Sequence, residues 1–82
     1  MQERRLDARL LLAENARVLV HGTQAEYDCI LRDISAGGAR LLVPAAPDIV
    51  EDLTLTYGAD GATICCRVVW QRPGEMGVMF VS

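Results

Sequence analysis

The segment Leu53-Thr54-Leu55-Thr56-Tyr57 decides the fold, because apolar residues alternate in it with threonines. Such alternation predicts a β-strand that is buried on one face only. The next four residues, 58–61, have a glycine at each end, which is typical of a hairpin loop. A second predicted strand, 64–71, follows this loop. On its expected apolar face lie Ile64, Cys66, Val68 and Trp70.

Working outward from this hairpin, four further short runs lie at 16–21, 27–35, 38–43 and 77–81, separated by turn residues. Six predicted strands at regular spacing are typical of a small antiparallel barrel or a closed sandwich, since closure removes exposed sheet edges. The only helical candidates are residues 6–13 and a single turn at 48–52. We therefore expect an all-β fold that forms one domain over residues 1–82.

The composition agrees with a single small domain. The chain has 82 residues, of which 51% are hydrophobic and 23% charged, as in globular proteins. Its longest apolar runs, such as residues 10–13, have four residues, whereas a membrane-spanning helix needs about twenty. The first residues contain no apolar stretch long enough for a secretory signal. No membrane span is predicted, and the cytoplasm is the expected location.

The charged residues are unevenly placed along an acidic chain. The net charge is −3, and all eight basic residues are arginines. Three of them, Arg4, Arg5 and Arg9, lie close together near the N-terminus. A net negative charge argues against a protein that binds long nucleic acids by neutralising many phosphates. A local basic cluster favours a small anionic ligand instead.

The sequence shows no constellation for catalysis or metal binding. Cys29, Cys65 and Cys66 form no C-x-x-C pair, and neighbouring cysteines on a strand point to opposite faces. We interpret them as reduced thiols that serve as small hydrophobic residues. His21 has no nucleophile or carboxylate beside it, and no phosphate-binding loop occurs. Neither a metal site nor an enzyme is therefore expected.

Two short motifs carry the functional information. The first is R-x-x-x-R, from Arg5 to Arg9, and the second is D-x-S-x-x-G, from Asp33 to Gly38. A guanidinium group pairs with phosphate or with the O6/N7 edge of guanine, and it can stack on a purine. Asp33 and Ser35 point the same way on a strand, where a carboxylate accepts hydrogen bonds from guanine. The glycines at 37 and 38 permit positive φ and let a base approach the backbone.

In this order and at this separation, the two motifs resemble those of the PilZ family, whose members bind the bacterial second messenger cyclic di-GMP. The resemblance extends over most of residues 3–81, although Ala8 stands where many members have proline. It implies a six-stranded antiparallel β-barrel over residues 14–82, preceded by a flexible arginine segment over 1–13. The ligand-binding residues that it implies are Arg4, Arg5, Arg9, Asp33, Ser35 and Gly38.

The same resemblance implies a signalling module. Cyclic di-GMP would order the N-terminal arginine segment against the barrel, and the reshaped surface would be presented to an effector protein. The ligand is the only small molecule implied, with no cofactor. The alternative is a protein-interaction module of the same fold that binds no nucleotide.

Each candidate residue also has a purely structural interpretation. The arginines can form a solvated run, and Asp33 and Ser35 can cap a hairpin turn. A bulge near Arg32 would reconcile Asp33 with the apolar face of its strand. Trp70 is expected in the barrel core beside Val68, and the alternative is a place at the rim where it packs beside a guanine. The arginines expected to be plain surface charges are Arg32, Arg40 and Arg72.

Overall fold

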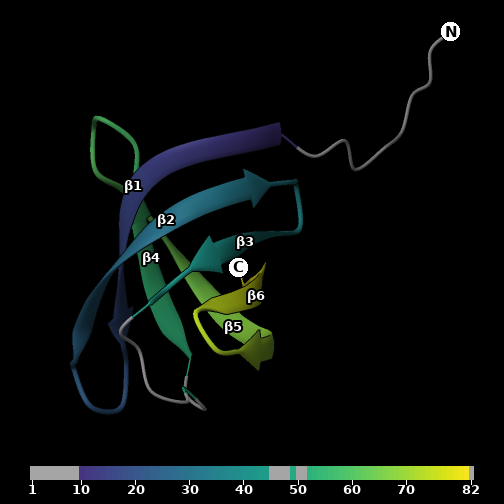
Figure 1. Ribbon diagram of the computed structural model, residues 1–82. Helices are drawn as coiled ribbons and strands as arrows, with labels where there is room; N and C mark the ends of the chain where they lie inside the picture. Colours follow the sequence, from purple (N-terminus) through teal and green to yellow (C-terminus); the bar gives the residue numbers. More distant parts are fainter. Residues whose placement is uncertain (1–9, 45–48, 50–51, 82) are drawn as a thin grey trace, which may run out of the picture.

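Six β-strands make up the described part of the chain in the computed structural model (Figure 1). The structure describes residues 10–44, 49 and 52–81, and for residues 10–12 the backbone only. The strands are β1 (Leu10–Val20), β2 (Glu26–Ile34), β3 (Gly38–Leu42), β4 (Leu53–Tyr57), β5 (Ala62–Arg72) and β6 (Glu75–Phe80). Within these residues, no helix is both long and apolar enough to cross a membrane.

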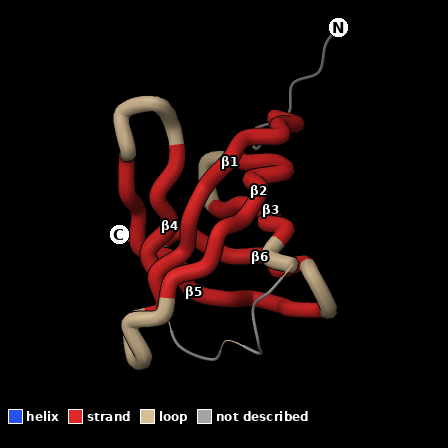
Figure 2. The backbone as a smooth tube through the Cα atoms, turned by 60° about the vertical axis from the view of Figure 1, so that its left-hand side comes forward, coloured by secondary structure: helices blue, strands red, loops and turns tan. Residues whose placement is uncertain are grey.

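The strands close into a barrel in the order β1-β2-β3-β6-β5-β4, and every neighbouring pair is antiparallel. In Figure 2 the strands wrap around a common interior, and the described turns lie at its ends. The pairing of β3 with β6 and of β1 with β4 joins segments far apart in the sequence and removes both sheet edges. The predicted all-β fold, a small six-stranded antiparallel β-barrel, is confirmed.

Strand β1 begins earlier than the sequence pattern predicted. Residues 10–13, which we expected to be helical, lie in β1, where Leu10 pairs with Ile34 and Leu11 with Asp33 of β2. The periodicity of so short an apolar run does not distinguish a helix from a strand. Residues 10–13 form a strand because β2 is available to pair with them. The rest of that expected helix, residues 6–9, lies outside the described residues, as does most of the expected turn at 48–52.

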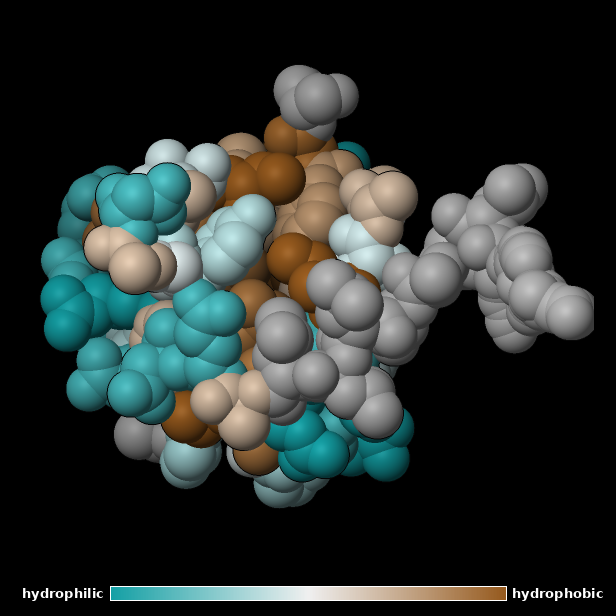
Figure 3. Space-filling model, turned by 90° about the horizontal axis from the view of Figure 1, so that it is seen from above, coloured by the Kyte–Doolittle hydropathy of each residue, from teal (hydrophilic) through white to brown (hydrophobic). Residues whose placement is uncertain are grey.

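The core is formed by alternate residues of all six strands. Leu31, Leu41, Leu53, Leu55 and Met76 are completely buried. Burial of each such side chain stabilises the fold by about 1.5–3 kcal/mol relative to exposure. The predicted half-buried pattern of β4 is confirmed, since Leu53 and Leu55 are buried and the threonines between them are not. Apolar side chains also gather in the middle of the face seen in Figure 3, with hydrophilic ones along one side.

A β-bulge in β2 moves Asp33 away from the core face. Leu31 pairs with Leu41 of β3, but Asp33 pairs with Arg40, so Arg32 is an extra residue in β2. A bulge near Arg32, which the sequence left open, is present, and Arg32 itself is exposed as expected. Without the bulge, Asp33 would face the interior together with Leu31. With it, the carboxylate lies on the outer face of the barrel.

A second bulge, in β5, has the same effect on Trp70. Val68 pairs with Val78 of β6, whereas Trp70 pairs with Gly77, so Val69 is the extra residue. Strict alternation placed Trp70 beside Val68 in the core, and this prediction is wrong. The bulge turns the indole to the outer face, where Trp70 is 37% exposed and Val69 61% exposed.

Candidate functional site

One row of directly paired residues crosses four strands of the barrel. Asp33 of β2 pairs with Arg40 of β3, Arg40 pairs with Gly77 of β6, and Gly77 pairs with Trp70 of β5. Directly paired residues project from the same face of a sheet. The two bulges therefore place a carboxylate, a guanidinium and an indole side by side on the outer surface, between two rows of core residues.

This row lies along a surface pocket of about 450 Å³. The pocket combines the D-x-S-x-x-G hairpin of β2 and β3 with the bulged part of β5. Its lining residues are Asp33, Ser35, Gly37, Gly38, Ala39, Arg40, Val69, Trp70, Gly77 and Val78. The structure thus brings together every predicted site residue that it describes, although Asp33 and Trp70 are far apart in the sequence.

Asp33 is the one charged residue among the buried ones in the described part of the chain. It is only 2% exposed, and its Oδ2 lies 2.9 Å from Nη2 of Arg40. Removal of a carboxylate from water is costly unless a cation and hydrogen bonds compensate it. Arg40 provides this compensation from the neighbouring strand. The carboxylate is therefore held in one orientation at the wall of the pocket.

Ser35 and Gly38 close the hairpin that carries the motif. The backbone N–H of Ser35 donates to the carbonyl oxygen of Gly38 over 2.8 Å, and Ser35 Oγ donates to the same oxygen over 3.4 Å. Gly37 accepts a backbone hydrogen bond from Phe80 of β6 at 2.9 Å. The interpretation of Ser35 as a turn-capping residue therefore holds, and its hydroxyl still lines the pocket.

Gly38 is required by the packing of β3 on β6. A Cβ atom at this position would collide with the carbonyl oxygen of Val78. The positive φ that these glycines permit is used at neither Gly37 nor Gly38. What the backbone needs at Gly38 is the absence of a side chain, which allows the closing strand to approach.

Trp70 forms the wall of the pocket opposite Asp33. Its indole occupies the space above Gly77, where a Cβ atom would collide with the ring. The guanidinium carbon of Arg72 lies 4.8 Å from the centre of the indole, within the range of a cation–π contact. Arg72 is exposed, as the sequence predicted, but it also packs against an aromatic ring. The structure places Trp70 on the outer face of the barrel at the pocket, and packing beside a guanine, our alternative, stays a prediction.

Arg40, which we expected from the sequence to be a plain surface charge, belongs to the pocket. Arg40 lines the pocket and lies between two carboxylates, Asp33 at 2.9 Å and Glu75 at 3.6 Å. A signal for this was present. Counting outward from the turn closed by Ser35 and Gly38 places residue 39 opposite 34 and residue 40 opposite 33, as observed.

The arginines of the first motif, Arg4, Arg5 and Arg9, lie outside the described residues. The structure does describe where that segment joins the barrel. Leu11 is the β1 partner of Asp33. In the sequence, Arg9 is two residues before Leu11.

The cysteines are free thiols with a packing role in the described part of the chain. Burial raises the pKa of Cys29 to about 11, with a smaller contribution from the negative charge of Asp28. Burial also raises the pKa of Cys66 to about 11, with a smaller contribution from Cys65. Both thiols are therefore protonated near neutral pH. No group of three or more metal-ligating side chains occurs among the described residues.

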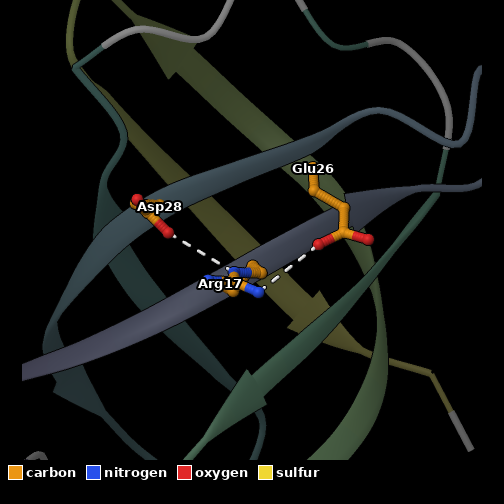
Figure 4. A network of polar contacts seen from close by, with 3 residues as sticks. All are labelled: Arg17, Glu26 and Asp28. Carbon is orange, nitrogen blue, oxygen red and sulfur yellow. Dashed lines mark hydrogen bonds and ion pairs between the residues drawn. The ribbon is translucent and has the colours of Figure 1, made fainter.

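A second arginine cluster lies on β1 and β2, away from the pocket. Arg17 lies between Glu26 and Asp28, with nitrogen-to-oxygen distances of 3.5 Å and 3.4 Å (Figure 4). All three side chains are exposed. Exposed ion pairs of this kind contribute little to stability, about 0–1 kcal/mol.

The fold and the pocket define a small closed β-barrel with a polar and aromatic site on its outer face. The sequence profile of the PilZ domain family matches residues 3–82, and the chain belongs to this family.

Among solved structures, the chain is similar to the PlzA protein of Borreliella burgdorferi, crystallised in complex with c-di-GMP, with a TM-score of 0.72 and 19% sequence identity. The match covers 94% of this chain and 34% of PlzA, so the chain spans about a third of that protein. At this identity the likeness is one of fold. No curated protein matches the chain.

Proposed function

We propose that this chain is a receptor domain for cyclic di-GMP. The observation that carries the proposal is the pocket in which the D-x-S-x-x-G motif meets Trp70, beside the point where the R-x-x-x-R segment enters the barrel. Membership of the PilZ family and the likeness in fold to PlzA, which was crystallised with c-di-GMP, support the same ligand. The pocket volume of about 450 Å³ lies within the range of small-molecule sites.

The two walls of the pocket suit the two sides of a guanine base. The carboxylate of Asp33 accepts hydrogen bonds from guanine N1 and N2, and these donors are absent on the same edge of adenine. The indole of Trp70 offers an aromatic surface on which a base can stack, a contact worth about 1–3 kcal/mol per base. Ser35 and Gly38 line the same pocket.

The phosphates of the ligand require cations. Among the described residues that line the pocket, Arg40 is the one cation, and it is already paired with two carboxylates. Arg5 and Arg9 are the proposed phosphate ligands, because guanidinium groups pair with phosphate oxygens through two hydrogen bonds. Arg4 contributes to the same positive cluster. The proposal is supported by the sequence separation, since Arg9 is two residues before Leu11, the β1 partner of Asp33.

In this proposal, binding orders the arginine segment, residues 1–9, against the barrel and so changes the surface that an effector protein meets. Residues 10–13 of the expected segment already belong to β1. A receptor for this bacterial messenger acts in the cytoplasm and needs no catalytic group of its own. Amide exchange of residues 3–9, measured with and without ligand, tests the ordering step. We expect protection only in the complex, and equal protection in both states would mean that the arginines are pre-organised.

Isothermal titration calorimetry with cyclic di-GMP tests the binding proposal, with cyclic di-AMP as the control. We expect binding of cyclic di-GMP and much weaker binding of cyclic di-AMP. Absence of heat and of any chemical-shift change with cyclic di-GMP would leave the alternative, a PilZ-like interaction module without a nucleotide ligand. Equal affinity for both dinucleotides would show that Asp33 does not select the base.

A further inference from the structure

Glu75 lies at the start of β6, next to the pocket but outside its lining. It belongs to the neighbouring row of paired residues, in which Leu42 pairs with Glu75 and Glu75 with Arg72. Its side chain is only 23% exposed. Neither sequence motif includes it.

The two carboxylate oxygens of Glu75 contact two different arginines. Oε2 lies 3.6 Å from Nε of Arg40, and Oε1 lies 3.7 Å from Nε of Arg72. Nε of Arg40 is buried, and among the described residues no group accepts a hydrogen bond from it. The carboxylate of Glu75 is therefore the negative charge that faces this buried donor.

Each of these arginines contacts one wall of the pocket. Arg40 reaches the carboxylate of Asp33 at 2.9 Å, and Arg72 lies over the indole of Trp70 at 4.8 Å. A continuous path therefore runs from Asp33 through Arg40, Glu75 and Arg72 to Trp70. It connects β2 to β5 across two intervening strands. Glu75 and Arg72 do not line the pocket. Through its contacts with Arg40 and Arg72, Glu75 therefore connects Asp33 to Trp70 without itself lining the pocket.

We propose that Glu75 is a positioning residue that fixes the Asp33 carboxylate and the Trp70 indole relative to each other, and thereby sets the selectivity for guanine. The proposal rests on the proposed function. A base is recognised in its plane by hydrogen bonds and through its face by stacking, so both groups must be placed together. A single carboxylate that holds two guanidinium groups reduces the rotational freedom of both. Without the Glu75 carboxylate, the guanidinium group of Arg72 can move away from the indole, and that of Arg40 can turn away from Asp33.

The test compares two variants that change the net charge equally. Glu75→Gln removes the proposed positioning carboxylate, and Asp52→Asn removes a carboxylate that pairs with Arg67 at 3.3 Å, outside the pocket. Affinities are measured by calorimetry for cyclic di-GMP and for cyclic di-inosine monophosphate, whose base lacks the N2 amino group. The ratio of the two affinities reports how well Asp33 is aligned, and it is insensitive to a general change in affinity for anions.

We expect Glu75→Gln to lower the preference for cyclic di-GMP by about twofold to tenfold, because two partly exposed ion pairs are lost, while Asp52→Asn leaves the preference unchanged. Trp70 is the only tryptophan, so its fluorescence gives an independent measurement on the ligand-free chain. Acrylamide should quench it more strongly in the Glu75→Gln variant than in the parent.

A preference in Glu75→Gln equal to that of the parent, or an equal loss in Asp52→Asn, would overturn the positioning role while the binding proposal stands. A parent chain that binds no cyclic di-GMP would overturn the proposed function, and the selectivity role with it. If Glu75→Gln does not fold, Arg72→Gln replaces it, since Arg72 is 67% exposed and lies outside the core. Unchanged quenching of Trp70 in Arg72→Gln would then contradict the path.

Discussion

Two arginines on this barrel each lie between two carboxylates, and their surroundings differ. Arg17 pairs with Glu26 and Asp28, whose side chains are 56% and 88% exposed (Figure 4). Arg40 pairs with Asp33, which is only 2% exposed, and with Glu75, which is 23% exposed. Residue types and local charge are the same in the two clusters, and each lies at a surface pocket with an aromatic residue, Tyr57 near Arg17 and Trp70 near Arg40. What differs is the carboxylate, since only Asp33 is buried.

The difference shows that burial of the carboxylate decides what such a cluster can do. Around Arg17, water solvates every partner, so the contacts are weak and the side chains keep alternative rotamers. Around Arg40, the carboxylate of Asp33 has lost its water and depends on the guanidinium for compensation. An acceptor held in this way is ready to meet hydrogen-bond donors of a ligand without first being ordered.

The largest expected effect is on ligand affinity. Arg9→Ala should weaken the binding of cyclic di-GMP by about ten- to a hundredfold, because a charge-assisted bidentate contact to phosphate is lost. Arg17→Ala removes the same charge from the exposed cluster and should leave the affinity nearly unchanged. Calorimetry on the two variants checks this. Binding by Arg9→Ala that equals the parent's would remove the arginine segment from the proposed site.

The next effect is on stability. Arg40→Ala leaves the buried charge of Asp33 without its cation, and we expect a loss of about 1–3 kcal/mol in the free energy of unfolding. Arg17→Ala should change it by less than about 0.5 kcal/mol. Urea unfolding followed by circular dichroism measures both values. If the two variants lose the same stability, burial is not what separates the clusters.

Base selectivity should differ in the same way between two aspartates of β2, the buried Asp33 and the exposed Asp28. Asp33→Ala should reduce the preference for cyclic di-GMP over cyclic di-AMP by about tenfold, since one charged acceptor is worth about 1.5 kcal/mol. Asp28→Ala, in the exposed cluster, should preserve the preference. Competition binding with the two dinucleotides gives the ratio directly. A ratio that is unaffected by Asp33→Ala would assign base recognition to another group.

The smallest expected effect concerns salt. Raising NaCl from about 0.05 M to about 0.5 M shortens the screening length from well over 10 Å to a few ångströms. The small stability difference between the parent and Arg17→Ala should disappear over this range. The larger difference for Arg40→Ala should persist, because a buried pair is screened much less. Repeated urea titrations at the two salt concentrations separate these outcomes.

Most of the fold could be predicted from local patterns, since alternation and turn residues lie within a few positions of one another. The bulge at Arg32 was also predictable, because without it Asp33 would share a face with Leu31. The bulge at Val69 was not, since valine, tryptophan and their neighbours suit either face of a strand. Trp70 can lie on the outer face because Gly77, its partner on β6, has no side chain in the space that the indole occupies.

The candidate site was predictable to the extent that its residues lie in one motif. Asp33, Ser35 and Gly38 are close in the sequence, and they line one pocket. Arg40 was missed although its pairing with Asp33 follows from counting outward from the hairpin turn. Glu75 was missed because its contacts depend on pairing between strands that are distant in the sequence. The register of β3 with β6 in particular depends on barrel closure, which no local pattern encodes. The roles of Arg4, Arg5 and Arg9 stay predictions.

The tight contact between Gly38 and Val78 has an evolutionary consequence. The glycine that ends the ligand motif is also the residue that lets β3 and β6 meet and complete the barrel. We therefore expect a mutant library selected only for folding to retain Gly38 as strictly as a library selected for binding, while Asp33 and Trp70 drift to other residues. Selection for folding alone would therefore keep Gly38 even after the other residues of the proposed binding site had changed.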